Sequence, residues 1–393
     1  MAEPAATFEG VLGNGAALRL LETALRTGEV SHAYLFHGPQ GVGKRTVARR
    51  FGAALVAGGD PGAENRALRG LHPDLTEVAP EGAFTTIGQV REVVRLASGR
   101  PFEGARRAFI LQADTLNVQA ANALLKTLEE PEGETVFLLV ATSREGVLPT
   151  ILSRAQVVRF NPVPTPVVAD LLEARGADQP ALAAALGRGS VGLSLRYAEE
   201  PEFGELREAV FEAGFAFSED FEERHGAVAR IVGRAEAVGA AREREVLAHF
   251  EEQDRRVKEG AKRAGRAARD GAVREALGLL ALLYRDAAVV GAGAEELAAN
   301  ADRVAEIRDR VNGYPGADWA GAALVFGEAR LALAYNVSPE AILEVALSRV
   351  RQKILEPSRG SSMSASQAGP SRGSATRGSS TSGSATPWSS RPR

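Results

Sequence analysis

The chain has no cysteine among its 393 residues, and its five histidines show no ligand spacing. Disulfides and thiolate-bound zinc are therefore excluded, and we expect neither zinc nor another metal site. The sequence also lacks any apolar run near the roughly 20 residues that a membrane span requires. Residues 1–10 lack the charged-then-apolar layout of a signal peptide, so we expect a cytoplasmic protein with no membrane contact.

A strong charge of one sign is lacking as well, because the formal net charge at pH 7 is -3. This balance excludes a protein that holds nucleic acid by bulk electrostatic attraction, so any contact with DNA should be local or shared within an assembly. What is present is an ordinary globular composition, with 45% hydrophobic and 25% charged residues. A chain of this length can form two or three domains with sizeable cores.

Short apolar strands alternate with amphipathic helices between residues 31 and 160, which predicts a parallel sheet flanked by helices. The predicted strands are residues 33–37, 74–79, 108–111, 135–141 and 156–160. Thr86, with Gln89 three positions later, predicts a capping box at the start of one helix. The apolar face of this helix is predicted to consist of Ile87, Val90, Val94 and Ala97. A second helix begins near Asn117 and ends before Pro131, with a predicted apolar set of Val118, Ala121, Leu125 and Leu128.

The remainder of the chain changes character after the prolines at positions 162, 164 and 166. Residues 161–202 predict a small helical lid, and residues 203–355 predict a separate helical bundle. Residues 356–393 are rich in Ser, Gly and Arg and predict a disordered tail. With residues 1–160 as the first domain, the fold class is α/β followed by all-α.

A phosphate-binding loop follows the first predicted strand. Gly38, Gly41 and Gly43 fall in register with Lys44, and a glycine-rich turn before a helix points backbone N–H groups at phosphates that a lysine can reach. The usual pattern then has Ser or Thr as a magnesium ligand, but Arg45 stands there. Thr46 comes one residue late, about 100° further round the helix. The loop therefore predicts nucleotide binding with impaired magnesium binding.

The carboxylates that hydrolysis requires are missing from the third predicted strand. Phosphoryl transfer to water needs one acid to hold the metal and a second group to orient the water. Leu111 and Gln112 stand at the end of this strand instead. Asp114 would lie roughly 10 Å beyond Leu111 on an extended chain, so we interpret it as a loop or cap residue.

Residues 117–131 closely resemble the helix after the Walker B strand in bacterial clamp-loader subunits, which belong to the AAA+ proteins. The resemblance continues through residues 137–142, similar to the sensor 1 strand that ends at Thr142. It extends to residues 148–155, where Ser153 and Arg154 match the Ser-Arg-Cys motif and Ala155 replaces the cysteine. Residues 31–36, 72–75 and 87–91 are similar too, so the resemblance covers about residues 8 to 160.

The resemblance implies an AAA+ P-loop domain, a helical lid and a C-terminal collar domain that forms a ring with other subunits. The family contains an ATP-hydrolysing motor, of tau/gamma type, and a delta-prime type that lends its neighbour an arginine. Four departures indicate the delta-prime type: Arg45, Leu111, Gln112, and Gly192, which stands where the motor's Gly-Ser-x-Arg motif has arginine. The four cysteines that motors carry within residues 58–71 are absent as well.

A delta-prime type implies no intrinsic ATPase, although the chain would be part of the DNA polymerase III holoenzyme. Arg154, next to Ser153, is then the arginine finger supplied in trans. The vestigial nucleotide site, which would hold ATP or ADP without hydrolysis, consists of Gly38, Gly41, Gly43, Lys44, Thr46 and Thr142. The implied partners are tau/gamma motor subunits, the delta subunit, the sliding clamp and, through the complex, primer-template DNA.

Two alternatives remain open: a motor subunit with an unusual active site, and an AAA+ adaptor outside replication. Residues 279–286 and 336–344 resemble the collar domain, although any apolar helical bundle would look similar. The cations between Arg255 and Arg269 favour a solvated helix face, with DNA contact as the alternative. The tail arginines likewise favour a solvated tail over one that contacts nucleic acid or an acidic protein.

Overall fold

The computed structural model describes residues 7–80, 84–130, 133–218, 220–250, 254–333 and 337–355. The chain divides into two units, residues 1–357 and 358–393. The predicted tail, the helix stop at Pro131 and the first residue of the segment 336–344 lie outside the described residues.

Five parallel strands form one sheet in the order β2-β3-β4-β1-β5. The strands are β1 (Ala33–His37), β2 (Leu75–Val78), β3 (Arg107–Gln112), β4 (Thr135–Ala141) and β5 (Gln156–Arg159). All five predicted strands are present, and the bounds that differ do so by one residue. All seven residues of β4 are buried, as expected for a central strand covered on both faces. The predicted parallel sheet flanked by helices is confirmed.

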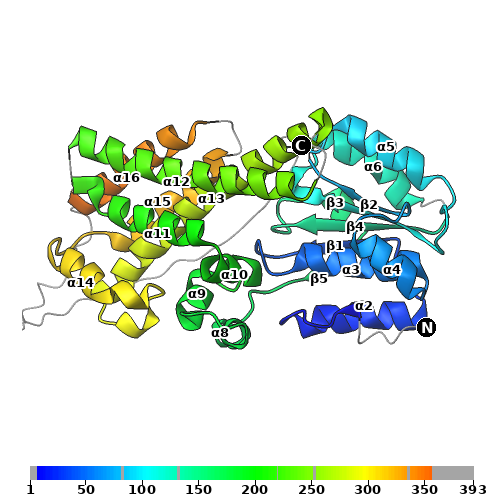
Figure 1. Ribbon diagram of the computed structural model, residues 1–393, viewed down its shortest axis with the longest axis horizontal. Helices are drawn as coiled ribbons and strands as arrows, with labels where there is room; N and C mark the ends of the chain where they lie inside the picture. The colour runs from blue at the N-terminus through cyan, green and yellow to red at the C-terminus, as the bar shows by residue number, and fades with distance from the viewer. Residues whose placement is uncertain are drawn as a thin grey trace, which may run out of the picture. The chain divides into compact units, whose positions relative to one another are not determined.

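Helices cover both faces of the sheet (Figure 1). One face carries α2 (Gly15–Thr27), α3 (Lys44–Ala57) and α4 (Pro61–Leu68). The other carries α5 (Ile87–Ala97), α6 (Val118–Glu129) and the short α7 (Pro149–Leu152). Alternate residues of a strand point to opposite faces, so Tyr34 and Phe36 of β1 pack with Phe51 of α3, while Leu35 packs with Leu124 of α6. The three-layer arrangement follows from this alternation.

The start signals of α5 and α6 act as predicted. Thr86 N donates to Gln89 Oε1 at 3.0 Å and Gln89 N donates to Thr86 Oγ1 at 3.3 Å, which completes the capping box. Asn117 Oδ1 accepts from Ala120 N at 2.8 Å at the start of α6. Both caps satisfy backbone donors that have no partner within the helix.

The predicted apolar face of α6 is wrong at Val118, which is 62% exposed. The helix buries Ala120, Ala121, Leu124 and Leu128 instead. Val118 lies two positions before Ala120, about 200° round the helix, and therefore points away from the sheet. On α5, Val93 is buried although the prediction omitted it, because it flanks Val90 and Ala97 on the same face.

The remaining described residues are helical, as predicted. The lid segment contains α8 (Thr165–Ala174), α9 (Pro180–Leu186) and α10 (Val191–Glu199). The bundle contains α11 (Pro201–Gly214), α12 (Phe221–Ala248), α13 (Arg255–Gly291), α14 (Val304–Asn312), α15 (Trp319–Ala332) and α16 (Pro339–Leu355). Its core gathers around the fully buried Tyr284, with Phe217, Trp319 and Phe326 next to it. No described helix combines the length and apolar character that crossing a bilayer requires.

Candidate functional site

The glycine-rich loop joins the carboxyl end of β1 to the first turn of α3, which begins at Lys44. Gly38 has φ 147° and passes so close to β5 that a Cβ atom would lie 2.1 Å from the Phe160 carbonyl oxygen. Gly41 and Gly43 have φ of 80° and 93°. Only glycine takes up these conformations readily, so the backbone geometry accounts for the spacing seen in the sequence.

Lys44 is 6% exposed, and its ammonium lies inside the loop. Nζ donates to the carbonyl oxygens of Gly38 at 2.6 Å and Pro39 at 2.5 Å. Burial lowers the pKa of Lys44 from 10.5 to about 8, and the carboxylate of Asp114 partly opposes this shift. The charged form therefore predominates at neutral pH, within reach of the loop where phosphate groups would bind.

Arg45 turns away from the loop toward β2. Its Nε pairs with Glu77 Oε1, and Arg49 Nη2 donates to Glu77 Oε2 at 2.7 Å. Burial raises the pKa of Glu77, but hydrogen bonds from the two arginines outweigh this effect and hold the pKa below its usual value. Thr46 is exposed on the next position of α3. Neither side chain replaces the missing magnesium ligand.

Asp114 lies closer to the loop than the sequence suggested. The chain does not continue extended after β3 but forms a 3-10 turn, Ala113–Thr115. The Asp114 carboxylate accepts hydrogen bonds from Gln112 Nε2 at 2.7 Å, Thr142 N at 2.7 Å and Thr142 Oγ1 at 2.6 Å. The premise of an extended chain was wrong because five residues join β3 to α6, too few for a strand to run on before the chain turns back.

The third strand ends without an acid, as predicted. Leu111 is 1% exposed and contributes to the core between the sheet and α5 and α6. Gln112 uses its amide to hold Asp114. Asp114 is thus the acid that sequence reasoning discounted, and its three donors occupy much of the capacity of its two oxygens.

The lid meets the loop through Ser190, the N-cap of α10, whose Oγ accepts from Leu193 N at 3.1 Å. A Cβ atom on Gly41 would lie 1.9 Å from this Oγ, so the loop and the lid pack closely here. Gly192, two residues later, has no heavy atom within 4 Å of its Cβ position. Position 192 therefore has room for a side chain but holds none.

The described residues contain no group of three or more His, Asp or Glu side chains that could hold a metal ion. The loop edge instead carries positive charge. The pKa of His37, at the end of β1, is lowered by burial and then by Arg159 and Arg144. An anion such as a nucleotide phosphate suits this environment better than a cation does.

Arg154 connects α7 to β5. Its Nη1 donates to the Thr150 carbonyl at 2.9 Å and to Ser153 Oγ at 3.0 Å, and its Nη2 pairs with Glu129 of α6. The side chain remains 32% exposed and lines an open hollow of about 570 Å³ together with His32, Leu128, Glu129, Ser153 and Ala155. An exposed guanidinium with a solvent-facing hollow beside it is accessible to another molecule.

The structure places the two groups of predicted site residues at opposite edges of the sheet. β1 and β5 are parallel, with Tyr34 opposite Gln156 and His37 opposite Arg159. The glycine loop, Lys44 and Thr142 follow the carboxyl ends of their strands, whereas Ser153 and Arg154 precede the amino end of β5. Four to five strand residues, roughly 13 to 17 Å, separate the two edges. Arg154 therefore does not serve the loop of its own chain.

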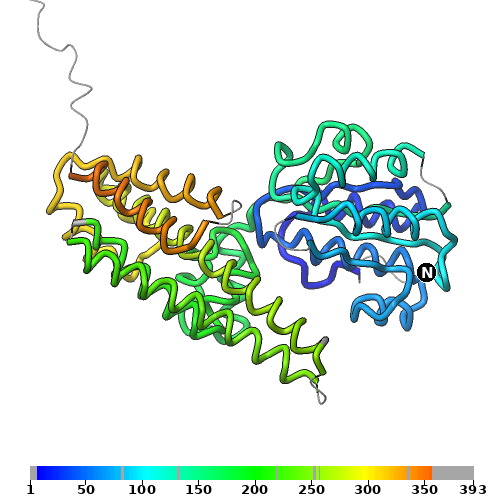
Figure 2. Tube along the Cα trace, turned by 90° about the horizontal axis from the view of Figure 1, so that it is seen from above, coloured from blue at the N-terminus to red at the C-terminus, as the bar shows by residue number. Residues whose placement is uncertain are grey.

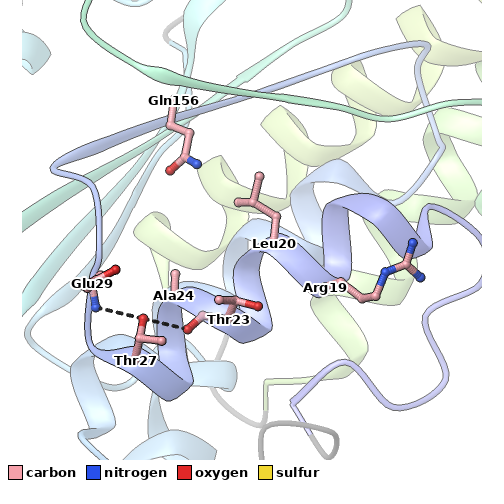
Figure 3. Close-up of a pocket in the computed structure, with 7 residues that line it drawn as sticks. All are labelled: Arg19, Leu20, Thr23, Ala24, Thr27, Glu29 and Gln156. Atoms are coloured by element: carbon pink, nitrogen blue, oxygen red, sulfur yellow. Dashed lines mark hydrogen bonds between the residues drawn. The ribbon is translucent and has the colours of Figure 1, made fainter.

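A separate hollow of about 370 Å³ lies beside α2 (Figure 3). It is lined by Arg19, Leu20, Thr23, Ala24, Thr27, Glu29 and Gln156. Thr27 Oγ1 donates to the Thr23 carbonyl at 2.9 Å and accepts from Glu29 N at 3.3 Å, so its hydroxyl already has both partners within this chain. None of the predicted site residues lines this hollow.

Comparison with known proteins places the similarity in the sheet domain. Residues 13–164 match a family described as DNA polymerase III, delta subunit. DNA polymerase III subunit delta' of Pseudomonas aeruginosa is 42% identical over 135 residues, which are 32% of this chain and 41% of that protein. Its counterpart in Bacillus subtilis is 31% identical over 202 residues, 49% of this chain and 61% of that protein. The alignments thus span about half the length of these relatives.

Subunit tau of Bacillus subtilis DNA polymerase III is also similar, with 34% identity over 164 residues, which are 39% of this chain and 29% of that protein. Similarity alone therefore does not separate the two subunit types.

Proposed function

We propose that the chain is an AAA+ subunit of the DNA polymerase III clamp loader, of the delta' type to which its sheet domain is similar, and that it acts as a non-hydrolysing stator. In this role it joins tau/gamma motor subunits and a delta subunit. Arg154 then reaches the ATP bound by a neighbouring motor, and the assembled complex loads the sliding clamp onto primed DNA.

The observation that carries this proposal is the position of Arg154 at the sheet edge opposite its own glycine loop. A guanidinium there, 32% exposed beside an open hollow, has access to a nucleotide on another subunit. An arginine neutralises the charge that develops on the transferring phosphoryl group, and when supplied in trans it is typically worth roughly 10³ to 10⁵ in rate.

The chain's own loop supports a role in binding without hydrolysis. Gly38, Gly41, Gly43 and Lys44 form a cradle that fits ATP or ADP phosphates, with Thr142 and Thr46 nearby in the vestigial site. Arg45 is committed to Glu77, and Gly192 supplies no cation. Asp114 is held by Gln112 and Thr142, so no described acid is free at the end of β3. A motor subunit requires those groups.

Arg154 is paired with Glu129 in the isolated chain, and this contact bears on how the finger works. A partly exposed ion pair is weak, typically contributing up to about 1 kcal/mol. An ATP γ-phosphate carries more negative charge than Glu129 does and replaces it readily. Ser153, whose hydroxyl accepts from Nη1, positions the guanidinium for this exchange.

The first prediction concerns Arg154→Ala in a loader reconstituted with motor subunits, delta subunit, clamp and primer-template DNA. The ATPase rate at the neighbouring motor site should fall by about 10³-fold or more, because the phosphoryl charge is no longer neutralised. Single-turnover hydrolysis with one competent motor site measures this rate. Arg154→Lys should recover little, because an ammonium lacks the planar fork of donors.

Arg69→Ala is a suitable control, since Arg69 is an exposed arginine at the end of α4, outside both edges of the site. It should leave the rate unchanged. Unaltered DNA-stimulated ATPase in the Arg154→Ala loader, with normal assembly, would refute the finger assignment. ATP hydrolysis by the isolated chain that is lost on Lys44→Ala would instead favour a motor subunit. Failure to assemble with the motor and delta subunits would favour an adaptor outside replication.

A further inference from the structure

The hairpin of α12 and α13 continues beyond the bundle core. The buried core takes its last residue of α12 at Val238 and resumes on α13 at Ala272 and Val273, with the partly buried Ala268 packed against it. None of the described residues between 240 and 267 contributes to it. We call residues 240–248 and 255–267 the arm. Figure 2 shows this end of the green hairpin running past the orange helices α15 and α16.

Two glycines hold the helices of the arm close together. A Cβ atom on Gly239 would lie 2.8 Å from the Gly265 carbonyl oxygen, and one on Gly265 would lie 2.9 Å from the Gly239 carbonyl oxygen. The two backbones therefore touch where the helices leave the core. This close crossing, together with the buried Ala261, gives the arm a defined shape although few large apolar side chains support it.

A row of cations runs along the outer side of α13. At 100° per residue, Arg255, Lys258, Lys262, Arg266 and Arg269 fall within about 80° of one another, and they extend over roughly 21 Å of helix. We call these five residues the basic stripe. Lys258, Lys262 and Arg266 are exposed, and Arg255 is 93% exposed. The buried Ala261 and Gly265 lie to one side of the stripe. Arg269 packs against α12, since a Cβ atom on Gly239 would lie 3.0 Å from its Cβ atom, whereas the four cations before it are exposed.

The acids of this segment do not neutralise the basic stripe. Glu259 pairs with Arg255 at 2.9 Å and Asp270 pairs with Arg269 at 2.9 Å, one at each end. Lys258, Lys262 and Arg266 have no carboxylate within ion-pair distance among the residues that the structure describes. The ion pairs of the stripe are thus confined to its ends, and the carboxylate of Glu243 on α12 lies beside Gly265, with Oε2 3.4 Å from the Cβ position of that glycine.

The basic stripe does not stabilise the helix that carries it. Arg255 and Lys258 stand in the first turn of α13, where the positive end of the helix dipole disfavours cations. Like charges four residues apart, such as Lys258 and Lys262, also destabilise a helix slightly. An arm that buries little and bears unfavourably placed cations is therefore better explained by a contact with an external anion.

We propose that the basic stripe binds the phosphate backbone of duplex DNA. A straight row of about 21 Å matches roughly six base pairs, over which the phosphates present a regular line of negative charge. Charge complementarity indicates that the ligand of the stripe is a polyanion. The identification of that polyanion as DNA rests on the proposed function. A chain with net charge -3 has to contact DNA locally or as part of an assembly, and the basic stripe provides a local row of cations.

The test measures binding of a fluorescent 20-base-pair duplex to the full chain by anisotropy over a range of salt concentrations. The triple variant Lys258→Ala, Lys262→Ala, Arg266→Ala removes three cations from the stripe. Its affinity at low salt should fall at least about tenfold, and the slope of log affinity against log salt should become shallower by about 2.7, at 0.9 per lost phosphate contact.

The matched control removes three cations elsewhere in the bundle: Arg230→Ala, Arg234→Ala and Arg349→Ala. These side chains are 55%, 50% and 50% exposed and pair with Glu212, Glu205 and Glu328. The control has the same net charge as the stripe variant and should keep the affinity and slope of the original chain. Equal losses in both variants, or none in the stripe variant, would overturn the proposal. A stripe variant that loses binding to phosphatidylserine vesicles to the same extent as to DNA would also overturn it.

An ATPase assay of the reconstituted loader distinguishes this proposal from the assignment of Arg154 as the arginine finger. The stripe variant should need a higher DNA concentration for half-maximal ATPase but reach the same maximum, whereas Arg154→Ala lowers the maximum. A normal maximum with an unchanged DNA requirement overturns the stripe and leaves the finger intact.

Discussion

Lys44 is a single buried charge whose titration makes the proposed nucleotide binding depend on pH. Its ammonium is enclosed by the loop, and burial lowers its pKa to about 8. In the unfolded chain the same group keeps its ordinary value of 10.5. Between these two values the unfolded state binds more protons than the folded state does, so the free energy of unfolding rises with pH across that window.

The second prediction follows from this pKa. Affinity for ADP should be highest near pH 7 and should fall by up to roughly tenfold per pH unit above about pH 8, because a neutral amine does not attract phosphate. Calorimetry at several pH values, in buffers of different ionisation enthalpy, should show proton uptake on binding near pH 8.5. Lys44→Met should bind weakly with a flat profile. A pH-independent affinity of the original chain would contradict the role of Lys44.

At the scale of elements, the loop and the lid form one packed unit. Ser190 begins α10, and its hydroxyl lies where the Cβ of any larger residue at position 41 would be. Gly43, in the same loop, has a similar positive φ of 93° but no heavy atom within 4 Å of its Cβ position. The two glycines therefore share the conformational requirement and differ in the contact with the lid.

This difference provides the third prediction. Gly43→Ala should lower the free energy of unfolding by about 1 to 2 kcal/mol through backbone strain alone. Gly41→Ala should lower it by about 1 to 3 kcal/mol more, because the new methyl group displaces Ser190. Urea denaturation of both variants measures the difference. Equal losses would show that the lid does not pack on the loop in solution.

The short turn between α9 and α10 connects the glycine loop of the sheet domain to the helical bundle. Leu186, at the start of this turn, is 2% exposed and belongs to the core of the helical bundle. Arg188 Nη2 donates to both oxygens of Glu275 on α13 at 2.7 Å, and Tyr197 donates to Glu275 Oε1 at 2.6 Å. With Ser190 against Gly41, this turn touches both the nucleotide cradle and the bundle. The domain limits at residues 160, 202 and 355 remain predictions.

The fourth prediction tests this link with two lid substitutions. Leu186→Ala removes a side chain from the bundle core and should destabilise α11 to α13 by about 2 to 5 kcal/mol. Val168→Ala acts in a separate cluster of the lid around Leu172 and should leave those helices unchanged. Hydrogen exchange measured by mass spectrometry reports each helix separately. Identical patterns in the two variants would mean that the lid and the bundle are not joined through Leu186.

Much of the fold follows from patterns within single elements. The alternation of apolar residues identifies a strand, and a capping box identifies the start of a helix, from residues that are neighbours in the chain. The strand around Leu35 and the cap at Thr86 were predicted correctly for this reason. The errors arose where a face was assigned from few positions. Val118 fits the apolar spacing of α6 but lies about 200° round the helix from the buried Ala120 and so points away from the sheet.

The sequence by itself determined the glycine spacing of the loop at Gly38–Lys44 and the absence of an acid at Leu111 and Gln112, because both are properties of residues close together in the chain. Only the tertiary structure decided that Arg154 lies at the sheet edge opposite Lys44 and that Asp114 turns back to Thr142. Those distances depend on the direction of strand pairing and on the path of a turn, which spacing along the chain does not specify.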